Sequence, residues 1–219
     1  MGDVISLAQR RRARRPAPSR QRPRATFSFD LASPFTYLAA ERAERLFADL
    51  QWRPAISEAL HRRDLATDPA ACERTKALAE ERALSLGMPM VWPDGFPDAG
   101  RRAMRVASLA AELRRAAPFV LAAGRLAFCG GFDLDEPETL AEAAAAAGLP
   151  LDAALEAARD EGRDAAMEAE GRRLLALGAD RLPALRAGRL LVCGEERLAE
   201  AALAWRSLDG AVAARPLGA

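Results

Sequence analysis

Alternating apolar and small polar residues mark the first regular element, TFSFDL over residues 26–31. This alternation is typical of a β-strand, because successive side chains point to opposite faces of a sheet. Ser33 and Pro34 follow, and the apolar positions of residues 35–50 then recur at helical spacing. Serine as the N-cap and proline at the first helical position form a strong helix-start signal. The pattern therefore predicts a strand followed directly by a helix.

A second strand, LQWRPAI over residues 50–56, ends this unit. Two strands around one helix make a βαβ element, which favours a parallel pair. The chain then becomes almost entirely helical, apart from a loop rich in proline and glycine at residues 87–100. One helix is expected to start at Asp68-Pro69 and to stop near Gly87, and another to start near Arg101, with Pro118 as a break or a new first turn. DEPE (135–138) resembles a capping box at the start of a helix that stops at Gly148. Two more helices are expected, one that begins at Pro150 and one that includes residues 167–178.

The last part of the chain changes character. Two short apolar runs, residues 182–188 and 189–194, flank Ala187-Gly188 and predict a hairpin. Residues 195–208 then show the spacing of a terminal helix. The order βαβ, helical block, ββα is that of an α/β chain with a thioredoxin-like fold and a large all-helical insertion.

These elements define three regions of the sequence. Residues 26–60 and 179–219 are expected to form the thioredoxin-like domain, and residues 61–178 the helical insertion. Residues 1–25 carry eight arginines and one acid, Asp3, which leaves the rest of the chain near −6 from a total of +1. This part is expected to be a disordered arginine-rich tail. Its functional interpretation is an arm for nucleic acid or an anionic membrane. The acidic folded part favours a plain solvated extension instead.

Composition excludes several classes of protein. Half of the 219 residues are hydrophobic and the net charge is small, which excludes wholesale disorder. No stretch approaches the ~20 apolar residues of a membrane-spanning helix. The three cysteines, Cys72, Cys129 and Cys193, are widely spaced and odd in number, so they fit buried thiols in a reducing, cytoplasmic compartment. The single histidine, His61, is expected at the surface and gives little support to a zinc site or a Ser-His-Asp triad, so no metal is expected.

Four segments resemble one known family in the right order: TFSFDLASPFTYLAAER, LQWRPAI, GMPMVWPDGFP with RRAMRVA, and GADRLPALRAGRLLVCGEERL. Together they are similar to DsbA-like thioredoxin-fold proteins over nearly all of residues 26–207. Within that family they look most like 2-hydroxychromene-2-carboxylate isomerases and kappa-class glutathione transferases. In that branch a serine-proline pair and an aromatic residue replace the CxxC of disulfide oxidoreductases. Here these positions are Ser33, Pro34, Phe35 and Thr36.

The resemblance implies a glutathione-dependent enzyme. Ser33 would hold the glutathione sulfur, and the backbone of Leu182, before a cis Pro183, would pair with the tripeptide. Glu196 and Arg197 would lie near its γ-glutamyl end, although the family has an aspartate where this chain has Glu196. Three aromatic residues, Phe35, Trp92 and Phe96, would line the substrate pocket.

Each of these residues also has a purely structural interpretation. Ser33 is equally well explained as an N-cap, and Glu195, Glu196 and Arg197 as the charged first turn of the last helix. Trp92 and Phe96 would equally serve to anchor their loop on the core.

The function expected from the sequence is a glutathione-dependent isomerase or transferase. Its substrate would be a small, aromatic electrophile, and the protein would be of the 2-hydroxychromene-2-carboxylate isomerase type. The alternative is a redox-silent DsbA-like module that binds a partner without turnover. A homodimer is left open, and neither a membrane nor, apart from the basic tail, nucleic acid is expected as a partner.

Overall fold

The computed structural model describes residues 24–47, 49–60, 68–97 and 100–213, with side chains up to residue 207. Most of the predicted tail and His61 lie outside these residues. Ala25, which the sequence places in the tail, is already part of the fold. Its side chain is buried and its carbonyl accepts a hydrogen bond from the Gln51 amide at 2.8 Å. The folded part thus begins by Ala25.

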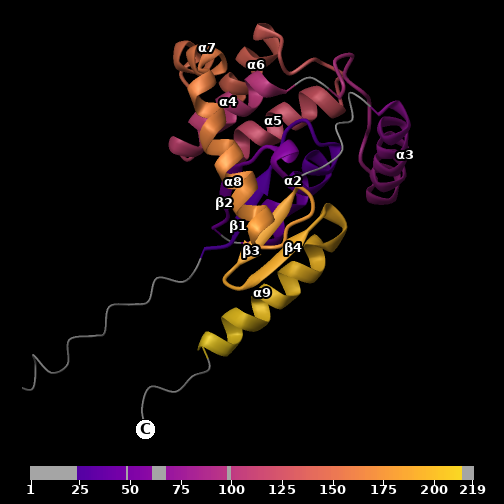
Figure 1. Ribbon diagram of the computed structural model, residues 1–219, viewed down its shortest axis with the longest axis vertical. Helices are drawn as coiled ribbons and strands as arrows, with labels where there is room; N and C mark the ends of the chain where they lie inside the picture. Colours follow the sequence, from indigo (N-terminus) through magenta and orange to yellow (C-terminus); the bar gives the residue numbers. More distant parts are fainter. Residues whose placement is uncertain (1–23, 48, 61–67, 98–99, 214–219) are drawn as a thin grey trace, which may run out of the picture.

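A four-stranded sheet with the order β2-β1-β3-β4 lies at the centre of the molecule (Figure 1). The strands are β1 (Thr26–Phe29), β2 (Gln51–Pro54), β3 (Ala184–Ala187) and β4 (Leu190–Cys193). Strand β1 pairs in parallel with β2 and antiparallel with β3, and β3 pairs antiparallel with β4. The predicted βαβ unit and hairpin are both confirmed. The hairpin turn contains Gly188 at a φ of +63°, a conformation that glycine adopts without steric cost.

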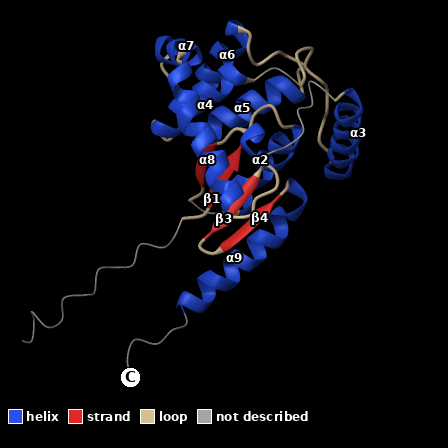
Figure 2. Cartoon of the chain, viewed as in Figure 1, coloured by secondary structure: helices blue, strands red, loops and turns tan. Residues whose placement is uncertain are grey.

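Helices make up most of the remaining chain, as Figure 2 shows. Helix α2 (Pro34–Leu46) connects β1 to β2, and α9 (Leu198–Ala213) follows β4 after the short helix η3 (Glu195–Arg197). The segment between β2 and β3 forms η1 (Ser57–Leu60), α3 (Pro69–Leu86), α4 (Arg101–Glu112), α5 (Ala116–Phe128), α6 (Pro137–Ala147), α7 (Leu151–Arg159), η2 (Glu161–Arg163) and α8 (Asp164–Ala176). Helices α4–α7 gather at one end of the molecule and α9 lies at the other, with α3 to one side (Figure 1). None of the helices in the described part is long and apolar enough to cross a bilayer.

Two hydrophobic clusters pack the helices against the sheet, one on each of its faces. Phe27 and Phe29 of β1 pack edge-on against Trp52 of β2, with ring centroids 4.7 and 5.9 Å apart. They belong to the larger cluster, which includes residues of α2, α4, α5 and α6. Ala184 and Leu174 belong to the smaller cluster on the α8 side. The alternation in residues 26–31 is therefore real, but both faces of β1 are covered.

Helix starts were predicted well except where a distant residue intervenes. Asp68 caps α3 by accepting from the Ala71 amide at 3.0 Å, as its position before Pro69 suggests. The capping box expected at residues 135–138 is wrong. Glu136 is the N-cap of α6 and its side chain makes no capping bond. The Asp135 carboxylate instead accepts from the backbone amide of Arg102 at 2.9 Å.

Candidate functional site

The ends of β1 and β3 bring two predicted site residues to the same edge of the sheet. Ser28 of β1 lies opposite Ala184 of β3 in an antiparallel register. Pro183 precedes β3, so it lies beside the end of β1, where the loop to Ser33 begins. The Leu182–Pro183 peptide bond is cis, as expected, and Leu182 is fully buried. The edge formed by the carboxyl end of β1 and the start of β3 is therefore the candidate site.

Ser33 is the N-cap of α2 by its backbone, with φ −90° and ψ 121°, and Pro34 occupies the first helical position. Its side chain, however, makes no capping hydrogen bond. The residue is only 6% exposed, and Ser33 Oγ is buried without a hydrogen-bond partner. Buried polar atoms are almost always paired, so an orphaned hydroxyl calls for an explanation. The capping interpretation of Ser33 does not supply one.

The loop that carries Ser33 is fixed from both ends. Asp30 is buried, and its two carboxylate oxygens accept from the backbone amides of Ala32 at 3.0 Å and Ser57 at 2.8 Å. The Asp30 amide donates to Thr36 Oγ1 at 3.3 Å, and the Thr36 amide donates to the Ser33 carbonyl at 2.9 Å. Side chains on both sides of Ser33 thus hold the turn between β1 and α2.

A second helix begins against the same loop. Gly100, the N-cap of α4, lies so close to Ala32 that an added Cβ would meet the Ala32 backbone nitrogen at 3.5 Å. The Leu31 amide donates to Met104 Sδ at 3.2 Å. The first turn of α4 therefore packs on the residues that precede Ser33. Neither α2 nor α4 has an acidic residue in its own first turn. The Asp135 carboxylate nevertheless accepts from the Arg102 amide at the start of α4, so it offsets part of the positive charge at that N-terminus.

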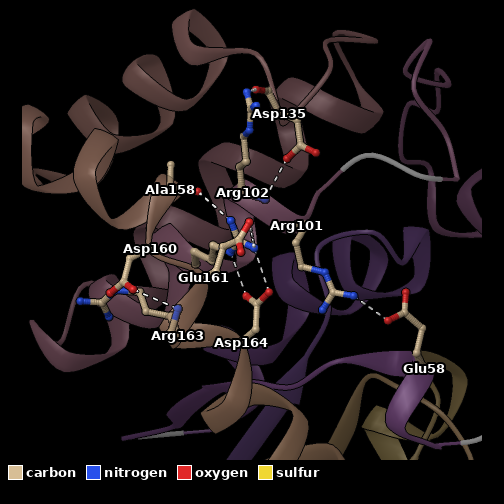
Figure 3. Close-up of polar contacts among 11 residues, drawn as sticks. Glu58, Arg101, Arg102, Asp135, Ala158, Asp160, Glu161, Arg163 and Asp164 are labelled. Atoms are coloured by element: carbon tan, nitrogen blue, oxygen red, sulfur yellow. Dashed lines mark hydrogen bonds and ion pairs between the residues drawn. The ribbon is translucent and has the colours of Figure 1, made fainter.

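One ion pair and two further hydrogen bonds fix the start of α4 to its neighbours, as Figure 3 shows. Arg101 Nη2 donates to Glu58 Oε2 of η1 at 2.6 Å. Arg102 donates through its amide to Asp135 Oδ1 and through Nη1 to the Asp135 carbonyl at 3.2 Å. Since Ser57 of η1 bonds Asp30, these contacts join η1, α4 and the Ser33 loop into one connected frame.

Further along α4, Arg105 binds Asp164 with two parallel hydrogen bonds of 2.9 Å. Asp164 is labelled in Figure 3. This bidentate geometry is the strong form of an arginine–carboxylate pair. The hydrogen bond from Arg105 holds the pKa of Asp164 below its usual range. The pair connects α4 to the start of α8 and so fixes the orientation of α4 against the sheet.

Glu195 is a buried charged residue. The sequence predicted it only as part of the charged first turn of the last helix. It is 1% exposed and follows Gly194, whose amide donates to the Pro183 carbonyl at 2.9 Å. Arg42 Nη1 of α2 contacts Glu195 Oε2 at 2.8 Å, and Arg82 of α3 contacts both carboxylate oxygens, at 2.5 and 3.3 Å. The hydrogen bond to Glu195 raises the pKa of Arg82. Glu195 therefore joins α2 and α3 to the turn after β4.

Glu196 and Arg197, the predicted contacts for the γ-glutamyl end, lie at the surface and bond to neighbouring side chains. Glu196 Oε1 accepts from Arg181 Nη2 at 2.5 Å, and both side chains are a little over 40% exposed. Arg197 forms a bidentate pair with Glu200 at 2.8 and 2.9 Å. Exposed pairs of this kind contribute little to stability. Their role toward a ligand stays a prediction.

Trp92 and Phe96 lie half-buried in the loop before α4. Their ring centroids are 4.6 Å apart, and Trp92 packs edge-on against Phe128 of α5 at 6.0 Å. Trp92 Nε1 donates to Glu80 of α3 at 2.7 Å, and Lys76 Nζ lies 5.8 Å from the Trp92 ring centroid. These contacts support the anchoring role of the two aromatic residues. Their role in a substrate pocket stays a prediction.

The first two turns of α2 contribute two further aromatic residues. Phe35 is half-buried against the main core, and Tyr37 is buried. The Tyr37 hydroxyl donates to the Pro89 carbonyl at 3.0 Å and lies 3.0 Å from Cys129 Sγ. Burial, with a smaller effect of Cys129, raises the pKa of Tyr37 far above its usual value. Tyr37 is therefore a neutral anchor for the loop that carries Trp92.

The described ranges contain no group of three or more histidine, cysteine, aspartate or glutamate side chains that could hold a metal ion. All three cysteines, which lie within these ranges, are free thiols. None of them is next to Ser33 in the sequence, and Ser33 and Thr36 occupy the positions where a CxxC would have its thiols. The chemical groups at this edge are thus an unpaired hydroxyl, helix N-termini, backbone amides and the Asp30 carboxylate, which already accepts from two of those amides.

Comparison with solved structures finds the same fold in several proteins of low identity. A 2-hydroxychromene-2-carboxylate isomerase is 19% identical with a TM-score of 0.70, covering 87% of this chain and 99% of its own. A protein assigned as a DsbA oxidoreductase from Streptomyces coelicolor is 21% identical with a TM-score of 0.65, covering 90% and 93%. A protein assigned as a disulfide isomerase from Nitrosomonas europaea is 18% identical with a TM-score of 0.65, covering 86% and 99%.

None of the curated proteins matches the sequence significantly. The family model for the DsbA-like thioredoxin domain, by contrast, matches residues 25–204. This range begins at Ala25, the buried residue directly before β1, and ends within α9. It contains the sheet, the helices between β2 and β3, and every predicted site residue. The chain belongs to the DsbA-like thioredoxin domain family.

Proposed function

We propose that this protein is a glutathione-dependent isomerase or transferase acting on a small, aromatic electrophile, of the 2-hydroxychromene-2-carboxylate isomerase type. The observation that carries the proposal is the buried Ser33 hydroxyl without a partner at the N-terminus of α2. A similar fold in a 2-hydroxychromene-2-carboxylate isomerase is consistent with it. A cytoplasmic location is part of the proposal, because three free thiols suit a reducing compartment.

The Ser33 site fits an anionic sulfur. A helix N-terminus stabilises negative charge through its dipole, and the first turn of α2 carries no acid that would oppose this. A hydroxyl that donates to a charged acceptor makes a stronger hydrogen bond than one that donates to a neutral acceptor. The unpaired Ser33 Oγ would therefore gain a partner that its protein surroundings do not provide.

Glutathione would be held by residues along the same edge. The backbone of Leu182 before Pro183 would pair with the peptide, while Glu196 and Arg197 would reach its γ-glutamyl end. When bound, glutathione supplies a thiolate that can add to a conjugated electrophile and leave again after bond rotation, or remain attached in a transfer. Phe35, Trp92 and Phe96 would contact the aromatic part of the substrate and keep water from it.

The alternative is a redox-silent binding module without turnover. It is favoured by the surface pairs Glu196–Arg181 and Arg197–Glu200, in which both proposed ligand contacts already have partners. Disulfide exchange has less support than either function, because the nucleophile must be a thiolate and Ser33 carries a hydroxyl.

Calorimetric titration separates the two candidates. Glutathione should bind the full chain with release of a fraction of a proton per site near pH 8, because binding would lower the thiol pKa. S-methylglutathione, which has no thiol proton, should bind without that release. Titrations in two buffers of different ionisation enthalpy measure the protons released. If neither tripeptide binds, the isomerase proposal is refuted and the binding module remains.

A further inference from the structure

We infer that Thr36 is a positioning residue of the Ser33 site, which keeps the Ser33 hydroxyl free for a ligand; the inference rests on the proposed role of Ser33. Thr36 is 1% exposed and occupies the last position of the Ser33-Pro34-Phe35-Thr36 segment. It touches no ligand in this role. It acts through the backbone of the loop that carries Ser33.

The backbone amide of Thr36 is the usual partner of a capping hydroxyl. An N-cap side chain accepts from the amide of the second or third helical residue, and Thr36 is the third residue of α2. Here that amide donates to the Ser33 carbonyl oxygen at 2.9 Å. The amide of Phe35, the second helical residue, makes no capping bond to Ser33 Oγ either, and Pro34 at the first position has no amide hydrogen. Ser33 Oγ thus loses the partner that would make it a cap.

The side chain of Thr36 maintains this arrangement. Thr36 Oγ1 accepts from the Asp30 amide at 3.3 Å. This hydrogen bond closes a loop that runs from Asp30 to Thr36 and includes Ser33. Asp30 is held in turn by Ala32 and Ser57, which donate their amides to its carboxylate. If Thr36 lost its hydroxyl, the Asp30 amide would lose its acceptor, and the loop would gain freedom to turn Ser33 Oγ toward the helix.

The S33C variant provides a direct reporter of this geometry, since it places a thiol at the same position without glutathione. A thiol aimed at a helix N-terminus has its pKa lowered below the usual value of about 8.5. The pKa is read from the pH dependence of alkylation by iodoacetamide, after subtraction of the rate for the wild-type chain with its three cysteines. Three further changes are then combined with S33C: T36V, T36S and T139V.

T139V is a closely matched control. Thr139 is also the third residue of a helix that begins with proline, α6, and it is buried as well. T36V should lower the S33C thiol pKa by about one unit, equivalent to a tenfold higher ratio of thiolate to thiol, because the thiol can then turn toward the N-terminus of α2. T36S should restore the pKa of S33C alone. T139V should leave that pKa unchanged. If T36V does not fold by circular dichroism, T36A replaces it with the same expected shift.

An S33C thiol pKa that is identical in the T36V, T36S and T139V backgrounds would refute the inference and leave Thr36 as an ordinary core residue. A higher pKa with T36V would refute it as well. Because no tripeptide is present, this result is independent of whether glutathione binds. Failure of the proposed function would show instead as absent binding in the calorimetric titration.

Discussion

Replacement of Glu195 by glutamine tests the contact that joins α2 and α3 to the turn after β4. Glutamine keeps the shape of the side chain but removes the charge that faces Arg42 and Arg82. Removing one partner of a buried ion pair costs about 3–5 kcal/mol, because it leaves the other charge uncompensated. The Arg42 and Arg82 side chains are 19% and 30% exposed, so water can partly compensate them. We therefore expect a loss near the lower end, about 3 kcal/mol.

The assay is urea denaturation at pH 7 followed by circular dichroism, together with a thermal melt. For a chain of 150–250 residues, 1 kcal/mol lowers the melting temperature by about 2–4 °C, so E195Q should melt about 6–12 °C lower. E200Q is the matched control, since Glu200 pairs with Arg197 at the surface, where such pairs contribute about 0–1 kcal/mol.

A double-mutant cycle with R82M identifies the partner. If Arg82 is destabilising once Glu195 is neutral, E195Q and R82M together should cost clearly less than the sum of the two single changes. A loss below about 1 kcal/mol for E195Q, or simple additivity with both R82M and R42M, would refute the argument that Glu195 connects these elements.

Two further predictions concern α8 and its contacts with the sheet. Burial alone would raise the pKa of Glu170, but hydrogen bonds and charges from Arg173, Arg53 and Ser28 outweigh it, so the folded-state pKa lies below the usual value. The ionised carboxylate thus adds stability above the unfolded pKa of about 4.3, and this stability is lost as the pH falls through the lower folded value. In urea melts at pH 7, 5 and 3, E170Q should be less stable than the wild type at pH 7, with a difference that shrinks by pH 3; a constant difference would contradict the assignment. G171A should lower the free energy of unfolding by about 1–3 kcal/mol in the same assay, because the added Cβ would meet Ala59 Cβ at 2.6 Å and the Ile56 carbonyl oxygen at 2.8 Å. R172A, at the next and exposed position, should change the stability little. Equal effects of the two substitutions would contradict this packing.

Local signals in the sequence predicted the main elements because short-range chemistry decides them. The start of α2 at Ser33-Pro34, the cap at Asp68 and the turn at Gly188 depend on neighbouring residues alone. The family motifs added the cis bond before Pro183.

Contacts between distant residues account for what the sequence did not predict. Asp135 is no cap because Arg102, 33 residues earlier, donates to it. The burial of Glu195 depends on Arg42 and Arg82, more than 110 residues away, and nothing in the charged first turn distinguishes it from Glu196. The free state of Ser33 Oγ follows from the direction of the Thr36 amide, which residue identities do not specify.

The thiol pKa of bound glutathione tests the central claim most directly. Thiolate absorbance in the ultraviolet is followed against pH for the wild type and for S33G, with both proteins folded and saturated. Glycine suits this test because it costs only a few tenths of a kcal/mol at an N-cap. The wild type should hold the thiol pKa below the usual value of about 8.5. A hydrogen bond to a charged group is worth roughly 1.5–3 kcal/mol, so S33G should raise that pKa by about 1–2 units. Titration curves that superimpose, or an ordinary thiol pKa in the wild type, would contradict the assignment of Ser33 as the residue that stabilises the thiolate.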